Sequence, residues 1–406
     1  MKTFAEASRG QKLVVFLLAA AALFVLPFIV QMAGNAWVRI IDIALLYVLL
    51  ALGLNIVVGY AGLLDLGYVA FYAVGAYTLG LLASPQLTDT FPAIAAAFSS
   101  GLHAPWWLVI PLGALVAGGA GVLLGAPTLK LRGDYLAIVT LGFGEIVRVF
   151  LNNLDAPVNI TNGPKGIAAI DEISIFGFSL GKTQHFFGLE WPKVTNYYFL
   201  FLLLVIFAVV ICHRLERSRI GRAWMAIRED EVAAKAMGIN TRNLKLLAFG
   251  MGATFGGVSG VMFASFQGFI SPESFSLYES VMIVAMVVLG GIGHLPGVIV
   301  GALLLAALPE VLRYVAGPLQ SMTDGRLDAS ILRQLLIAVA MIGIMLSRPR
   351  GLWPSPEHGR VRAAESETPM PSPGTGGELP ARVTRVDLAP DTQIPPLAGH
   401  IVPTDR

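Results

Sequence analysis

Apolar stretches long enough to cross a membrane recur along most of the chain. A helix needs about 20 mostly apolar residues to span the hydrocarbon core. That length predicts about ten spans, over 13–33, 37–58, 62–83, 106–127, 134–151, 196–213, 245–267, 278–293, 297–316 and 331–346. The stretches 134–151 and 278–293 are short or interrupted by glycine, so each either crosses fully or re-enters from one side. The predicted fold class is an all-α integral membrane bundle.

The first stretch follows Lys2, Arg9 and Lys12, as the core of a secretory signal would. Its apolar core is longer than that of a signal peptide, and no small-x-small cleavage site closes it. We therefore interpret it as an uncleaved first span.

Composition excludes the soluble alternatives. Of the 406 residues, 55% are hydrophobic and 13% are charged, about half the charged share of an ordinary soluble domain. The mean hydropathy is +0.72. A net charge of +2 does not suggest nucleic-acid binding, and we expect no metal site because no cluster of cysteine and histidine occurs in the sequence.

Charge also predicts the orientation and the domain limits. The segment 213–245 is rich in arginine and lysine, whereas the loop 84–105 has neither. Basic loops stay on the cytoplasmic side, so ten spans place both termini in the cytoplasm and the 152–195 loop outside. After a membrane domain over 1–353, the tail 354–406 is rich in proline, glycine and charge, and we predict that it is disordered.

Glycine spacing indicates how the helices pack. Gly252, Gly256 and Gly260 share one helix face, as do Gly113, Gly121 and Gly125 with Ala117. Small residues at this spacing allow close helix contact in lipid. The glycines around Gly293, together with Pro296, predict a helix break at 289–296.

Most acids in the predicted spans have a base three residues away, in the pairs Arg39/Asp42, Glu145/Arg148 and Glu310/Arg313. Such spacing lets each pair neutralise itself on one helix face, which favours structural roles over solute contact. Asp65 has no evident local partner.

Two catalytic motifs are missing and a third fails. Gly181-Lys182-Thr183 resembles the end of a phosphate loop, but Phe176 stands where the motif needs glycine. No Gly-x-Ser-x-Gly or His-Glu-x-x-His sequence occurs. The chain is therefore not expected to be an enzyme.

The charged segment 218–240 differs from the spans around it. Ile220, Trp224 and Ile227 have helical spacing, Asp230 can cap a second short helix, and Gly238 can end it. That second helix would present a small-residue face of Ala233, Ala234 and Ala236. Such a helix fits a cleft on a soluble partner, and the alternative is an interfacial helix on anionic lipid.

Five segments together resemble a known family. They are Leu54–Gly62 with Leu66–Tyr68, Leu129–Arg148, Thr161–Ile167, Arg219–Gly238 and Val288–Gly293. From about the second span to Trp353, the chain resembles the M-type permease subunit of high-affinity branched-chain amino acid ABC importers.

The resemblance implies import of leucine, isoleucine and valine into the cytoplasm across the bacterial inner membrane. It also implies a second related permease subunit, two cytoplasmic ATPase subunits that bind ATP and magnesium, and an external solute-binding protein. This chain itself would bind no cofactor, and its segment 218–240 would be the coupling helix. In the importer signature, Val232 stands where glutamate is expected, and Glu231 precedes it.

The candidate residues form two sets. For ATPase coupling they are Gly221, Arg222, Arg228, Glu229, Asp230, Glu231, Ala233, Ala234 and Gly238. For the translocation path they are Asp65, Glu145, Arg148, Thr161, Gly163, Pro164, Gly290, Gly291 and Gly293. Three alternatives stay open: the same machine importing urea or short amides, an ion-coupled secondary transporter, and an integral membrane enzyme.

Overall fold

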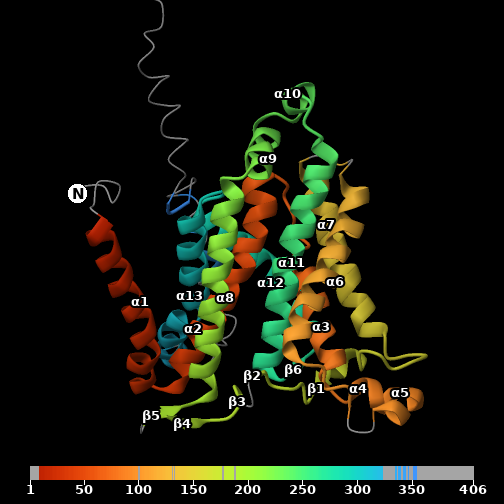
Figure 1. Ribbon diagram of the computed structural model, residues 1–406, viewed down its shortest axis with the longest axis vertical. Helices are drawn as coiled ribbons and strands as arrows, with labels where there is room; N and C mark the ends of the chain where they lie inside the picture. Colours follow the sequence, from red (N-terminus) through yellow and green to blue (C-terminus); the bar gives the residue numbers. More distant parts are fainter. Residues whose placement is uncertain are drawn as a thin grey trace, which may run out of the picture. The chain divides into compact units, whose positions relative to one another are not determined.

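The computed structural model describes residues 9–98, 101–129, 131, 133–175, 178–186, 189–322, parts of 334–346, and 351–353. The longer helices are α1 (Arg9–Met32), α2 (Asn35–Asn55), α3 (Val69–Leu82), α6 (Trp106–Thr128), α7 (Asp134–Asn153), α8 (Lys193–Glu216), α11 (Thr241–Gln267), α12 (Leu277–Gly290) and α13 (Leu295–Met322). Figure 1 shows them side by side, with most running between two opposite ends.

Shorter elements lie at the two ends of the long helices. At one end are α9 (Arg219–Glu229) and α10 (Glu231–Ala236), and we call this the α10 end (Figure 1). Helices α4 (Gln86–Thr90) and α5 (Pro92–Ala97) and all the strands lie at the opposite end. The remaining helical turns are η2 (Ile56–Tyr60), η3 (Gly163–Lys165) and η4 (Pro272–Phe275).

The strands form three antiparallel pairs. β1 (Ile167–Ala168) pairs with β6 (Phe269–Ile270), in the register Ile167↔Ile270. β2 (Ser174–Ile175) pairs with β3 (Phe178–Ser179), and β4 (Gln184–Phe186) pairs with β5 (Leu189–Trp191). The described part of the predicted 152–195 loop thus contains two short antiparallel strand pairs and β1, and α8 begins at Lys193.

Six helical segments among the described residues are long and apolar enough to cross a membrane. They are Asn35–Tyr60, Trp106–Thr128, Lys193–Glu216, Thr241–Gln267, Pro272–Gly290 and Leu295–Leu312. Ala20–Met32 and Val69–Leu82 are shorter apolar helices. α7 covers the predicted 134–151 span but carries Asp134, Glu145 and Arg148, and is not among the six. The predicted 331–346 span and the 354–406 tail fall largely or wholly outside the described residues, so the count of about ten stays a prediction.

Two predicted helices are shorter than expected. The 62–83 span becomes helical only at Val69, because α2 ends in the π-helical turn η2 and Gly62 then takes φ +69°. The 278–293 span ends at Gly290, because Gly291 takes φ +115°. Both conformations are in the region that favours glycine, so these residues break their helices.

α11 lies among α2, α3 and α6, and glycine lets the backbones meet. A Cβ on Gly257 would lie 2.5 Å from the Gly113 carbonyl oxygen of α6, and one on Gly256 would lie 3.1 Å from Cβ of Phe71 in α3. A Cβ on Gly252 would contact Val57 and the Gly53 carbonyl of α2. The predicted close packing of these glycine faces is confirmed.

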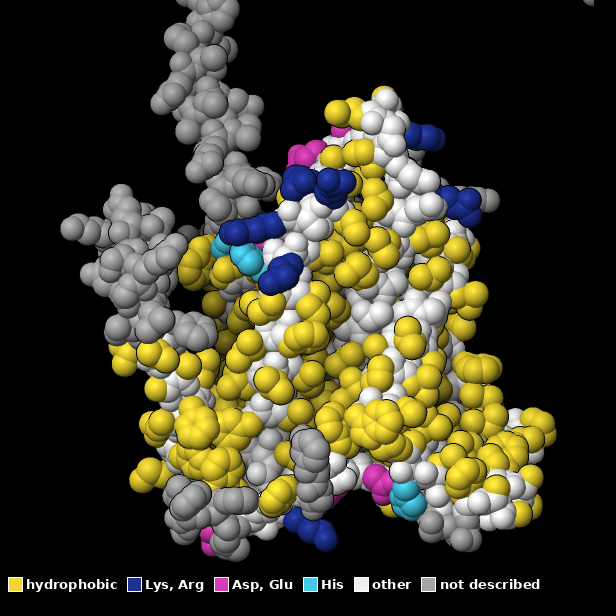
Figure 2. All heavy atoms as spheres, in the orientation of Figure 1, with side chains coloured by type: hydrophobic (Ala, Val, Ile, Leu, Met, Phe, Trp, Pro, Cys, Tyr) yellow, Lys and Arg dark blue, Asp and Glu magenta, His cyan; other side chains and the backbone are white. Residues whose placement is uncertain are grey.

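The surface separates by character along the helices. Large apolar side chains are exposed on the long helices, for example Leu115 and Leu123 of α6 and Phe207 of α8, which are 71%, 74% and 63% exposed. Figure 2 shows apolar side chains covering the middle of this face and lysine and arginine gathered toward the α10 end. This is the distribution of a protein surrounded by lipid with one basic end.

Candidate functional site

The α9–α10 helix pair projects from the ends of α8 and α11 (Figure 1). Ser218 begins α9, and its hydroxyl accepts a hydrogen bond from the Gly221 amide at 3.1 Å. Trp224 is fully buried, and its indole nitrogen donates to the Leu244 carbonyl oxygen of α11 at 2.7 Å. The Trp224 contact fastens α9 to α11, so the pair is anchored to the membrane helices.

The two predicted caps of α10 are present. The Asp230 carboxylate accepts from the Val232 and Ala233 amides at 2.8 and 3.1 Å, which satisfies amides that the first helical turn leaves open. At the other end Gly238 takes φ +82°, the left-handed conformation in which many helices end.

The exposed side of α10 differs from the predicted one. Ala234 is buried, whereas Ala233 and Ala236 are exposed, so the three alanines do not form one exposed face. The large apolar side chains of Val232 and Met237 are instead 67% and 83% exposed. We call Val232, Ala233, Ala236 and Met237 the α10 tip. Alanine spacing alone could not show which side packs inward.

Glu231 contacts the bundle. Its carboxylate lies 2.7 Å from the ammonium of Lys245, which is only 8% exposed. This ion pair joins the first turn of α10 to α11. Glu231, which precedes the position where the signature has glutamate, therefore helps to hold the helix pair against α11.

Arg228 turns away from the α10 tip. One guanidinium nitrogen donates to the Gly59 carbonyl oxygen of η2 at 2.6 Å, and another lies 3.2 Å from the Glu229 carboxylate. The side chain also packs on Gly62, where a Cβ would lie 2.5 Å from Cγ of Arg228. Gly221 lies close to the end of α8, and Arg222 is exposed with its guanidinium on the Arg217 carbonyl.

Of the glycine candidates Gly290, Gly291 and Gly293, Gly293 lies against the Arg228 guanidinium. The Gly293 amide donates to the side-chain oxygen of Asn55 at 2.9 Å, and Gly290 lies against Gly297 of α13. Asn55 and Gly59 lie in the family-like segment Leu54–Gly62, and neither was predicted to be a site residue. An asparagine inside an apolar run was the signal available for this contact.

Asp65 lies in the non-helical segment 61–68 between η2 and α3. It is 1% exposed, and one carboxylate oxygen accepts from the Gly67 amide at 2.9 Å. The Leu66 amide donates to the Thr140 hydroxyl of α7 at 3.0 Å. Asp65 thus has the local partner that the sequence did not reveal, two residues ahead in its own turn.

The remaining path candidates lie at the opposite end. Arg148 contacts Glu145 at 2.9 Å, as predicted, and also Glu273 of η4 at 3.3 Å. The buried Thr161 hydroxyl donates to the Leu151 carbonyl at 2.7 Å. Gly163, with φ +52°, and Pro164 begin η3 beside the end of α7. The structure therefore separates the path candidates into two groups.

Among the described residues no close ion pair joins Arg39 and Asp42, although the charge of Arg39 still acts on Asp42. Arg39 donates to the Gln267 side chain of α11 at 2.5 Å and lies over the Phe266 ring, while both carboxylate oxygens of the buried Asp42 lack a hydrogen-bond partner. Tertiary contacts therefore overrode helical spacing. The Arg313 side chain of the third pair lies outside what the structure describes.

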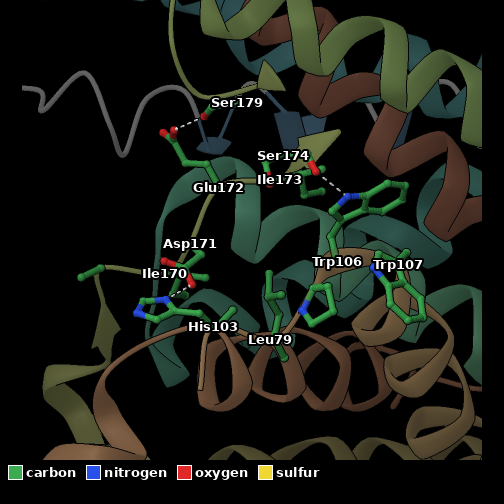
Figure 3. A pocket seen from close by; sticks show the side chains of 14 residues that line it. Leu79, His103, Trp106, Trp107, Ile170, Asp171, Glu172, Ile173, Ser174 and Ser179 are labelled. Atoms are coloured by element: carbon green, nitrogen blue, oxygen red, sulfur yellow. Dashed lines mark hydrogen bonds and ion pairs between the residues drawn. The ribbon is translucent and has the colours of Figure 1, made fainter. Parts of the chain in front are cut away.

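The sequence reading also missed an open cavity of about 1150 Å³ at the end opposite α10. Figure 3 shows Trp106 and Trp107 at the right, with Ser174 next to Trp106, and His103 beside Asp171 at the left. His103 contacts Asp171 at 2.5 Å, and the Trp106 indole donates to the Ser174 carbonyl at 2.6 Å. The feature that the sequence shows for the 84–105 loop, its lack of lysine and arginine, does not predict a cavity.

Apolar helices joined through glycine, with a helix pair projecting at one end, define a multi-pass membrane protein. The family model described as "Branched-chain amino acid transport system / permease component" matches residues 37–345, and the chain belongs to this family. The chain is thus a transport permease component and not a catalytic subunit.

Several characterised proteins are similar to this chain. It is 41% identical to the high-affinity branched-chain amino acid transport system permease protein LivM of Escherichia coli, over 80% of this chain and 71% of that protein. It is 25% identical to the permease protein LivH of Salmonella typhimurium, over 78% of this chain and 93% of that protein. A probable LivM of Methanocaldococcus jannaschii is 27% identical over 76% of this chain and 90% of that protein. No solved structure matches the chain significantly.

Proposed function

We propose that this chain is the transmembrane permease subunit of an ATP-driven ABC importer that moves leucine, isoleucine and valine into the cytoplasm. The family and the similarity to LivM support the solute class. The observation that carries the ABC mechanism is the α9–α10 pair, whose apolar tip is exposed while Trp224 and Glu231 anchor its base. A rigidly anchored helix with exposed apolar side chains suits docking into a cleft on a partner.

The rest of the machine is proposed on the same basis. A second related permease would complete the path, and similarity to both LivM and LivH supports such a pair. Two cytoplasmic ATPase subunits would hold ATP and magnesium, and an external solute-binding protein would deliver the solute.

The basic α10 end supports a topology in the bacterial inner membrane with that end in the cytoplasm. About ten spans would then place both termini in the cytoplasm, with the membrane domain over 1–353 and a disordered tail over 354–406.

Uptake in vesicles tests the proposal. Reconstituted vesicles that contain this chain with its co-purified partners, oriented with the ATPase side inside, are loaded with or without ATP and given labelled leucine with the solute-binding protein outside. We expect saturable, ATP-dependent uptake that isoleucine and valine inhibit. Uptake inhibited only by urea or short amides would change the solute, and uptake by this chain alone without ATP would overturn the ABC assignment.

Gly238→Asp tests the docking surface directly. No described atom lies within 4 Å of a Cβ built on Gly238, so the new carboxylate is free to act on a docked partner, and the backbone strain of a side chain at positive φ is shared with the control below. We expect normal insertion and at least a tenfold loss of leucine uptake. Gly268→Asp is the matched control, because Gly268 also has positive φ, +69°, and open space, but lies at the opposite end. Equal uptake by both variants would refute the docking role.

A further inference from the structure

Arg228 lies where two breaks in the membrane helices meet. Its guanidinium donates to the Gly59 carbonyl in η2, and a Cβ on Gly293 would lie 2.8 Å from the same nitrogen. Gly293 belongs to the turn between α12 and α13, which are far from η2 in sequence. One side chain from α9 therefore contacts both breaks.

The π-helical turn explains why the Gly59 carbonyl is available. The Leu63 amide, which would continue an α-helix by donating to Gly59, donates instead to the Val57 carbonyl at 3.1 Å. A carbonyl at a helix C-terminus carries partial negative charge and favours a cationic donor. Arg228 supplies that donor from another helix.

The two breaks are also joined to each other. The Gly293 amide donates to the side chain of Asn55, in the last turn of α2. A Cβ on Gly59 would contact Asn55 and lie 2.8 Å from the Gly293 nitrogen. Glycine at 59, 62 and 293 therefore makes the space that the Arg228 side chain and the two turns share.

The segment that follows η2 is fastened to three further helices. The Leu66 amide donates to Thr140 of α7, and the Ser280 hydroxyl of α12 donates to the Leu66 carbonyl. The Tyr68 hydroxyl donates to the Gly252 carbonyl of α11 at 2.9 Å. A displacement of η2 would thus disturb contacts with α7, α11 and α12 together.

We infer that Arg228 is a positioning residue that transmits movement of the α9–α10 pair to the helix breaks at Gly59 and Gly293. The inference rests on the proposed function, since an ATPase must move the pair. Arg228 does this from inside the bundle, because its guanidinium donates to the Gly59 carbonyl and lies against Gly293. The movement of α9 then shifts both breaks at once, which changes the cytoplasmic half of the path.

The test compares Arg228→Ala and Arg228→Lys with Arg222→Ala in the assembled transporter. Arg222 is the control for the loss of a positive charge from α9 without loss of a contact to the two breaks, because it is exposed and donates to Arg217 of its own segment. We measure ATPase co-purification, ATP hydrolysis and leucine uptake. For Arg228→Ala we expect co-purification and hydrolysis within about twofold of wild type, but at least a tenfold loss of uptake per ATP hydrolysed. Arg228→Lys should restore part of the uptake, because its ammonium can still donate to Gly59.

Hydrogen exchange reports on the same contact without transport. In Arg228→Ala we expect at least tenfold faster exchange of the Leu63 and Gly293 amides, with Arg222→Ala unchanged at both. Unchanged exchange, or full uptake per ATP, would overturn the inference, as would joint loss of co-purification and hydrolysis, which would make Arg228 a direct ATPase contact. Absence of ATP-dependent uptake by the wild type would instead refute the proposed function, while the exchange result would still decide whether Arg228 holds the two breaks.

Discussion

Asp42 and Asp65 are both buried carboxyl groups, but they differ in their contacts. One oxygen of Asp65 accepts from the Gly67 amide within its own turn, and its other oxygen has no hydrogen-bond partner. Both oxygens of Asp42 lack a partner. Burying a polar group without a hydrogen bond costs about 1–3 kcal/mol in mutational data. Removing one partner of a buried hydrogen bond has a similar cost, because the remaining donor or acceptor stays buried without a partner.

Alanine at these two positions should therefore change stability in opposite directions. Asp42→Ala removes an uncompensated carboxyl, and we expect it to raise the apparent Tm of the detergent-purified protein. Asp65→Ala leaves the Gly67 amide without its acceptor. We expect this to lower the free energy of unfolding by about 1–3 kcal/mol, and the Tm with it. Thermal unfolding followed by tryptophan fluorescence measures both. A Tm lowered equally by both variants would mean that Asp42 has a stabilising partner in the membrane.

Sequence spacing could predict the contact of Glu145 with Arg148 but not the fate of Arg39 and Asp42. Residues three apart on a helix can meet, yet Arg39 can also reach a neighbouring helix, and there Gln267 and Phe266 bind it. The partner of a long side chain depends on tertiary packing. For the same reason the inward direction of Arg228 was beyond sequence reasoning.

At the scale of the element, α10 shows what local chemistry can specify. The cap at Asp230 and the glycine end at Gly238 follow from short-range hydrogen bonding and backbone conformation, and both were predicted from the sequence. The choice of buried face was not, because Ala234 packs inward only once α10 is held against α11 by Glu231 and Lys245. The beginnings of α3 and α13 were likewise set by glycine breaks whose partners are distant in sequence.

Loss of the Asp230 cap should weaken the coupling of ATP hydrolysis to transport to the extent that α10 loses its helical structure. Asp230→Ala removes two hydrogen bonds to the Val232 and Ala233 amides, at a cost of about 1 kcal/mol. We expect faster hydrogen exchange at these two amides and reduced ATP-dependent leucine uptake.

Asp230→Asn is the control, because asparagine caps helices about as well as aspartate. It should restore both the exchange protection and the uptake. If Asp230→Asn restores the exchange protection but not the uptake, the negative charge itself acts on the partner.

At the scale of the whole molecule, length and hydropathy located most of the long helices, since apolar stretches in lipid have few alternatives to helix. The arrangement of those helices was less accessible. Glycine faces on 106–127 and 245–267 predicted close contact without naming the partners. The structure pairs them, with Gly113 of α6 against Gly257 of α11 and Gly121 against Ala253. Lipid offers little hydrophobic gain on helix association, so such backbone contact carries much of the packing energy.

A pair of glycines in α6 tests how much this packing contributes. A Cβ on Gly121 would lie 2.5 Å from Cβ of Ala253 and 3.0 Å from the Phe249 carbonyl oxygen, whereas one on Gly119 has no atom within 4 Å. Gly121→Ala should force α6 away from α11 and destabilise the protein by about 1–3 kcal/mol. Gly119→Ala, two residues away at the same depth, should be neutral or gain up to about 1 kcal/mol from helix propensity. Unfolding of both variants in the same detergent measures the difference, and equal stabilities would mean that α6 and α11 do not meet closely through this face in the folded protein.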